Sequence, residues 1–144
     1  MRYQKGSLGR VFILKFEDKD DILHEIKQLA LKETIKAGTI TLIGGMRSAG
    51  IVSGPQKTVI PPDPLWVKFD DTREVLGVGT LFWNGDEPII HIHGAMGRER
   101  ETLTGCIRKD CSVFLVVEAI ITEIIGTNAH KALNKETGLV MLEV

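Results

Sequence analysis

The segment Ser112–Ile125 constrains the fold most, because it is a long apolar run rich in valine and isoleucine. β-Branched side chains favour extended backbone, so this run predicts a central strand of a sheet. Residues 119–123 taken alone fit a helix equally well. Arg108-Lys109-Asp110, just before the run, predicts a turn that separates it from an earlier strand.

One helix is expected, over about residues 20–36. Its apolar residues recur at three- and four-residue spacing and form one stripe, which consists of Ile22, Leu23, Ile26, Leu29 and Ala30. Asp18 or Asp20 can cap its N-terminus, and Gly38 is a suitable stop beyond its last turn. We interpret His24, which lies on this helix, as a partly exposed surface residue.

Short apolar or alternating segments predict the remaining strands: Val11–Phe16, Thr39–Ile43, Leu65–Phe69, Glu74–Trp83 and Gly138–Val144. Gly44-Gly45 indicates a sharp bend or bulge between two strands, and Asn84-Gly85-Asp86 indicates a tight hairpin turn. Residues 55–64 are expected to form a loop, and residues 126–137 to be irregular. The sequence therefore predicts a mixture of many strands with a single helix.

Composition limits the class of protein. The chain has 144 residues, of which 43% are hydrophobic and 26% charged, so we expect one soluble globular domain over residues 1–144. It has no run of about 18 apolar residues and no hydrophobic signal region near Met1, so we expect a cytoplasmic protein without a membrane segment. A formal net charge of -1 argues against a broad electrostatic footprint for nucleic acid, but a local basic patch stays open.

Two of the four histidines lie in one short segment, Ile89–Gly97. Successive side chains of a strand point to opposite faces, so His91 and His93 project from the same face. If the next strand returns with Gly97 facing Thr102, Cys106 lies opposite His93 on that face. Two imidazoles and one thiol are ligands that zinc accepts. The alternative is a pair of half-buried imidazoles that hydrogen-bond to neighbouring strands.

The segments His91–Arg98 and Thr104–Ile107, followed by the hydrophobic strand with Val117–Ala119, resemble the PPC domain, the plant and prokaryote conserved domain, in its stand-alone prokaryotic form. Members read His-Leu-His, a small-residue stretch, a charged turn, Gly-Gly-His-Leu and a strand with a glutamate. The likeness extends from Val11 to about Ile125. It implies an α+β fold with a mainly antiparallel twisted β-sheet, one principal helix and assembly as a homotrimer.

The chain departs from this family pattern at two places. The third histidine of the family is Cys106 here, which could preserve a zinc site, because thiolate also binds zinc, or could abolish it. Plant nuclear members carry an Arg-Gly-Arg-Pro hook that inserts into the minor groove of A/T-rich DNA. Here Gly9-Arg10 is followed by Val11, so the residues give the DNA-binding label of the family little support.

Three further residues are candidates for the site. Glu118 lies within an aliphatic strand and could orient a metal ligand or accept a proton in metal-assisted chemistry. A solvent-facing charge, or a partner of Arg47 or Arg98, is the simpler interpretation of Glu118. Arg47 and Arg98 are themselves pocket candidates, although a solvated strand arginine is the simpler interpretation of Arg47.

These observations leave three classes of function open. The first is a small metal-binding protein, with or without hydrolase- or lyase-type chemistry on an unidentified small molecule in a pocket at a trimer interface. The second is a DNA-binding protein. The third is an oligomerisation or partner-binding module without chemistry. No triad of nucleophile, base and orienting group can be assembled, because Ser48, Ser53 and Ser112 have no motif around them.

Overall fold

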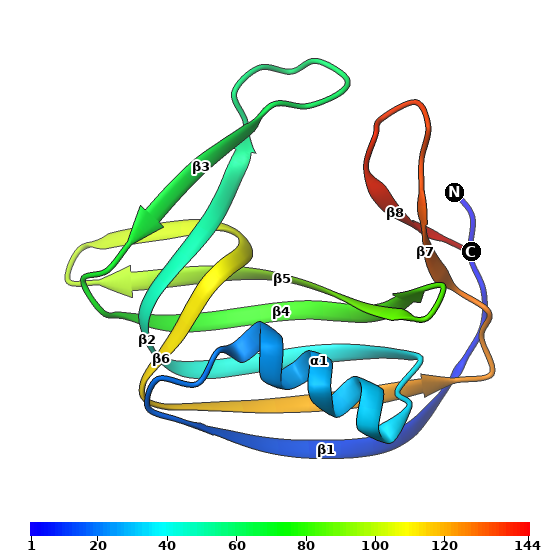
Figure 1. The fold of residues 1–144 in the computed structure, drawn as a ribbon, viewed down its shortest axis with the longest axis horizontal. Coiled ribbons are helices and arrows are strands. Elements are labelled where there is room, and N and C mark those ends of the chain that lie inside the picture. The colour runs from blue at the N-terminus through cyan, green and yellow to red at the C-terminus, as the bar shows by residue number, and fades with distance from the viewer.

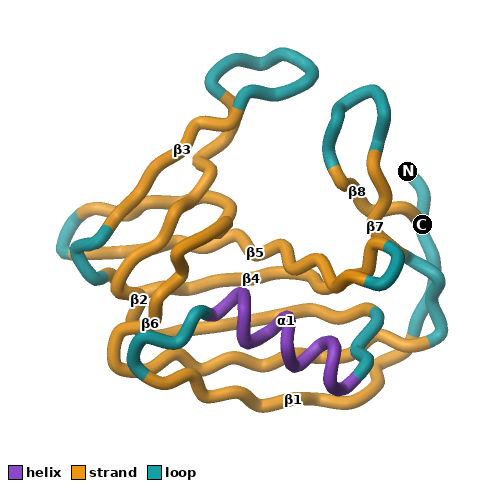
Figure 2. Tube along the Cα trace, viewed as in Figure 1, coloured by secondary structure: helices purple, strands orange, loops and turns teal.

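The computed structural model describes all residues, 1–144, and consists mainly of antiparallel strands with one helix (Figures 1 and 2). The elements in chain order are β1 (Ser7–Glu17), α1 (Ile22–Glu33), β2 (Ala37–Pro55), β3 (Pro64–Phe69), β4 (Arg73–Asn84), β5 (Glu87–Arg98), β6 (Glu101–Ile125), β7 (His130–Leu133) and β8 (Val140–Glu143). The predicted α+β class with one principal helix is confirmed. Helix α1 has 12 residues, and no helix of the structure could span a membrane.

The main sheet has the strand order β1-β6-β5-β4-β2-β3, and β2 also pairs with β6. The long strands β2 and β6 therefore take part in it twice. Their first and last portions meet different neighbours, so the sheet bends and the β2–β3 hairpin rises from its main plane (Figure 1). As predicted, β3 is an edge strand. Strands β7 and β8 form a separate pair, of which β7 packs beside β4.

Both long strands run through segments that were expected to interrupt them. Strand β2 continues through Gly44-Gly45 as a bulge, and β6 continues through Arg108-Lys109-Asp110, so the turn predicted there is wrong. Gly44 has a φ of +136°, and a Cβ there would overlap the carbonyl oxygen of Val116. Bulges absorb the turn-type residues while pairing resumes on either side. Strand β7 is also a correction, because an irregular segment was expected there.

The helix begins later and ends earlier than predicted. Its N-cap is Asp21, whose carboxylate accepts a hydrogen bond from the backbone N–H of His24 at 2.9 Å. The prediction of Asp18 or Asp20 as the cap is wrong, since their carboxylates accept from other partners. The helix ends at Thr34, which adopts a left-handed conformation. Gly38 is not its stop but lies within β2.

The hydrophobic core lies between α1 and one face of the sheet. Ile22, Ile26 and Ala30 of the helix are fully buried, as are Ile40 of β2 and Ile92 of β5. Burying each large aliphatic side chain contributes about 1.5–3 kcal/mol relative to leaving it in water. The opposite face of the sheet has no helix over it (Figure 1), so the two faces of the same strands meet different environments.

Candidate metal centre

The hairpin formed by β5 and β6 positions the two histidines and the cysteine. Gly97 pairs with Thr102, and His93 pairs with Cys106 across the strands. Cross-strand partners lie on the same side of a sheet, and residues two apart on a strand share that side. The predicted register is therefore confirmed, and His91, His93 and Cys106 lie on the face opposite α1.

The three possible ligand atoms are close together. The Nε2 atoms of His91 and His93 are 3.1 Å apart, and all three ligand atoms lie within 4.8 Å of one another. In a tetrahedral zinc site, two nitrogen ligands lie about 3.3 Å apart, and a nitrogen and a sulfur about 3.6 Å. The histidine pair thus has nearly the spacing that zinc requires. A small inward movement of the Cys106 side chain would complete the set.

The environment of His91 favours the neutral imidazole. Its partial burial lowers the pKa to about 4, and the positive charges of Lys131 and Arg108 act in the same direction. His91 is therefore uncharged at neutral pH, which is the form that binds metals. Because the Nε2 atoms of His91 and His93 face each other, one must donate and one accept unless a cation lies between them.

Cys106 is the buried member of the group, with a relative exposure of 3%. Burial raises the pKa of its thiol, while the charges of Arg108 and Lys131 oppose that rise. The thiol therefore keeps its proton at neutral pH until a metal displaces it. Gly105 allows this burial, because a Cβ there would lie 2.6 Å from the carbonyl oxygen of Val52, the cross-strand partner of Cys106.

Glu118 does not join the three ligand residues within one chain. It is exposed and pairs across the strands with Lys15 and Ile43. In this half of β6, strands β2 and β4 lie between β6 and β5. Three strand spacings correspond to about 14 Å. The predicted role of Glu118 beside the metal ligands is therefore wrong for a single chain, because β6 is one continuous bent strand whose two halves reach different neighbours.

The arginine candidates lie elsewhere too. Arg47 forms an ion pair with Asp18 at 2.6 Å and stacks over Phe114, whereas Arg98 binds Asp71. Neither pairs with Glu118, so the alternative that matched it with these arginines is also wrong. Each arginine already has an acidic partner near the bend of the sheet. Arg98 lines a polar cavity together with Asp71 and Arg73, and the lining of this cavity includes neither histidine.

Two basic residues that sequence reasoning missed do act on the site. Arg108 and Lys131 are the two side chains whose positive charge reaches both His91 and Cys106. The spacing of Arg108, two residues after Cys106, could have revealed it as a neighbour on the same face. Lys131 carries no such signal, because it comes from β7, outside the main sheet.

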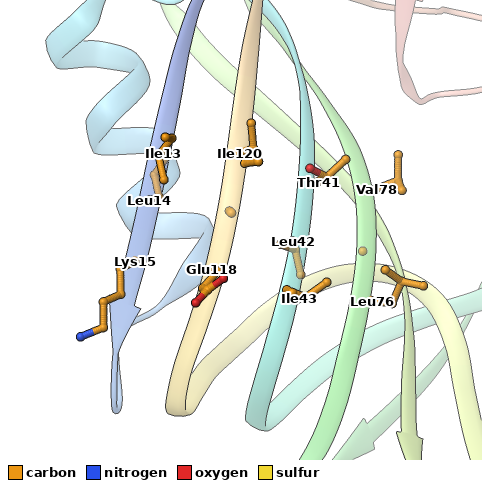
Figure 3. A pocket seen from close by; sticks show the side chains of 12 residues that line it. Ile13, Leu14, Lys15, Thr41, Leu42, Ile43, Leu76, Val78, Glu118 and Ile120 are labelled. Carbon is orange, nitrogen blue, oxygen red and sulfur yellow. The ribbon is translucent and has the colours of Figure 1, made fainter.

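Several large apolar side chains are exposed on the rest of this face. Figure 3 shows side chains of β1, β6, β2 and β4 in adjacent rows across four neighbouring strands. They line a shallow groove of about 480 Å³. We call the following residues the open apolar face: Val11, Ile13, Ile43, Leu76, Val78 and Ile120. Val78 pairs directly with His93, so this face is continuous with the candidate metal centre.

Solved structures with the same fold come from several organisms. A metal-containing protein from Archaeoglobus fulgidus superposes with a TM-score of 0.88 at 21% identity, over 100% of both chains. A plant- and prokaryote-conserved protein from Pyrococcus horikoshii has a TM-score of 0.82 at 21% identity, over 100% of this chain and 98% of the other. A protein from Ralstonia eutropha, named as a candidate DNA-binding protein, has a TM-score of 0.77 at 18% identity, over 92% and 90%.

At these identities the likeness to solved structures establishes the fold alone. A search among curated proteins found no match. The family model of the Plants and Prokaryotes Conserved domain matches residues 3–125, which include the helix, all strands of the main sheet and the three possible ligands. The sequence resemblance is thereby confirmed, and this chain belongs to the Plants and Prokaryotes Conserved domain family.

Proposed function

We propose that this protein binds a divalent metal ion, zinc, through His91, His93 and Cys106. The observation that carries the proposal is the convergence of their three ligand atoms within 4.8 Å on one face of the sheet. The ligand chemistry fits, since zinc accepts imidazole nitrogen and thiolate sulfur together. The neutral state of His91 supports the proposal because its nitrogen needs no deprotonation before it binds.

Three protein ligands would leave one tetrahedral position open, which distinguishes ligand-binding and catalytic zinc sites from closed structural ones. When bound, zinc would supply a Lewis acid at that position. The residues of this chain would hold it from two adjacent strands, with Cys106 buried and His93 at the surface. No carboxylate is among the groups whose charge acts on His91, so the site favours ligand binding over a role for a nearby general base.

Metal analysis of the protein, purified without added metal and without a histidine tag, tests this proposal. We expect about one zinc per chain in the wild type and less than about a tenth of that in the His91→Ala His93→Ala variant. The matched control is His24→Ala, because His24 is exposed on α1 and should leave the metal content unchanged. Equal metal content in the wild type and the double variant would remove this site from the proposal.

We also propose that the open apolar face is covered by further copies of this chain, in a homotrimer. Ile13 is 87% exposed and Leu76 and Val78 are more than 60% exposed, although all three lie in the middle of paired strands. Contiguous apolar patches of this kind mark interaction sites. Lys15 and Glu118 line the same groove. Each copy therefore presents one positive and one negative side chain at the proposed contact surface. The number three comes from the family resemblance.

DNA binding is the second candidate function, and the names of two proteins with this fold, from Ralstonia eutropha and Bacteroides thetaiotaomicron, favour it. The residues of this chain support it less than metal binding, because the formal net charge is -1. Affinity of a DNA-binding surface comes largely from basic residues that contact phosphates, and it would weaken steeply with salt.

A further inference from the structure

Two basic side chains beside the candidate metal centre have no acidic partner. Neither Arg108 nor Lys131 forms an ion pair, in contrast to Arg10, Arg47, Arg73 and Arg98. Lys131 is nevertheless 7% exposed, which makes it the only buried lysine of the chain. A buried cation without a counter-charge is costly, because the water that solvates it is lost without compensation.

The two cations reach this place from unrelated elements. Between its pairings with Ile51 and Gly50, β6 contains one extra residue, Arg108, so this residue forms a bulge. Bulges redirect side chains at functional places. Lys131 lies on β7, which packs beside β4, and its charge acts on Cys106 and on Arg108. The convergence of both on the same ligand residues is therefore set by tertiary structure.

A cavity of about 420 Å³ adjoins Arg108. Val52, the cross-strand partner of Cys106, lines it together with Trp66 of β3 and Leu139 of the loop between β7 and β8. Three prolines complete its wall: Pro55, Pro62 and Pro64. The walls are mainly apolar, and Arg108 is the one charged side chain among them. Cavities of this size and composition hold small molecules, with a few polar groups that fix the orientation.

We propose that Arg108 and Lys131 bind the oxyanion head of a small ligand beside the metal ligands, and that the apolar body of this ligand occupies the cavity at Val52 and Trp66. This inference rests on the proposed metal site for the position of the head group, but the two cations would attract an anion without a metal. A divalent metal with one thiolate ligand adds further net positive charge. The head is therefore a carboxylate or a phosphate, and an arginine can bind either in a bidentate manner.

Calorimetric titrations of zinc-loaded and metal-free protein test the proposal with four probes. Benzoate and phenyl phosphate carry an apolar body, whereas acetate and inorganic phosphate do not. Benzoate is paired with acetate, and phenyl phosphate with inorganic phosphate. In the preferred pair, we expect the aromatic probe to bind about tenfold more tightly than the small one, because its ring leaves water. The preferred pair, carboxylate or phosphate, identifies the head group. Trp66→Ala should remove the advantage of the ring.

The variants Arg108→Met and Lys131→Met keep the apolar stems of the side chains and remove the charges. Each should weaken the aromatic probe about tenfold or more, with unchanged zinc content. Arg100→Met and Lys135→Met are matched controls at exposed positions and should bind like the wild type. Wild-type affinity in the two site variants would overturn the proposal, as would the absence of binding by all probes to the wild type. Binding by metal-free protein that needs Arg108 would support it even if the zinc analysis fails.

Discussion

The two faces of the main sheet are built from the same strands and differ in almost every other respect. On the face under α1, the residues Ile40, Leu42 and Ile92 are at most 2% exposed and belong to the same core cluster as Ile22 and Ile26. On the other face, their immediate neighbours are half-buried or exposed, and these neighbours include both histidines and the open apolar face. Only the first face completes a hydrophobic core within one chain.

This difference separates the residues that stabilise the fold from those that are free to bind. All three candidate ligands lie on the face that contributes little to the core, and Cys106 is the only one of them that is buried. Side chains there can change without loss of the fold. The exposed apolar surface on the same side indicates an interaction site, and we infer that further copies of the chain cover it.

The largest expected effect follows from placing a charge on the open apolar face. Ile13→Asp should convert a trimer of the wild type into monomers, because a carboxylate cannot be buried at an apolar interface without a partner. Ile13 is the most exposed side chain of this face, so its substitution should not disturb the fold of the single chain. Mass determination in solution measures the effect.

Leu31→Asp is the matched control for assembly. Leu31 is also an exposed leucine-sized side chain, at 42%, but it lies on the outward side of α1. It should leave the mass unchanged. If Ile13→Asp and the wild type had the same mass, the open apolar face would not be the contact between copies.

Substitutions on the face under α1 should change the stability of the chain rather than its assembly. Ile26→Ala removes a fully buried side chain of α1 and leaves a cavity, so the free energy of unfolding should fall by about 2–5 kcal/mol. Leu31→Ala, on the exposed side of the same helix, should change it by less than about 0.5 kcal/mol. Urea unfolding of both variants measures the difference, and similar losses in the two would contradict the assignment of the core to this face.

The sequence predicts the local parts of the molecule well. The apolar stripe of α1, the edge strand β3, the Asn84-Gly85 turn and the pairing of His93 with Cys106 all follow from patterns within a few residues. The candidate metal centre could be predicted because its ligands come from a single hairpin, in which the length of the turn determines which residues face one another.

Features that depend on distant segments could not be predicted in the same way. Turn-like residues at Gly44 and at Asp110 lie within continuous strands, because pairing between β2 and β6 resumes on both sides of each irregularity. The position of Lys131 depends on how β7 packs beside β4, for which the sequence has no local signal. The prediction that Glu118 lies beside the metal ligands is wrong for the same reason, since its distance from the histidines depends on the bend of β6.

The contrast between the buried thiol and the neutral histidine within the candidate metal centre predicts that zinc binding depends on pH. Burial raises the pKa of Cys106, so the thiol is protonated at neutral pH and must lose a proton when a metal binds. His91, whose pKa is lowered to about 4, has no proton to lose above about pH 5. Zinc affinity should therefore rise about tenfold per pH unit between about pH 7 and 8.5.

Competition with a chelator of known affinity measures this slope. The slope should disappear in Cys106→Ala, which retains the two histidines and has no thiol proton to release. A rise of the same steepness in that variant would show that the released proton comes from another group. A flat profile in the wild type would show that the sulfur does not bind the metal, and that the two histidines act without it. Either result would remove Cys106, the one buried ligand, from the site and leave a metal centre that lies wholly on the exposed surface of the sheet.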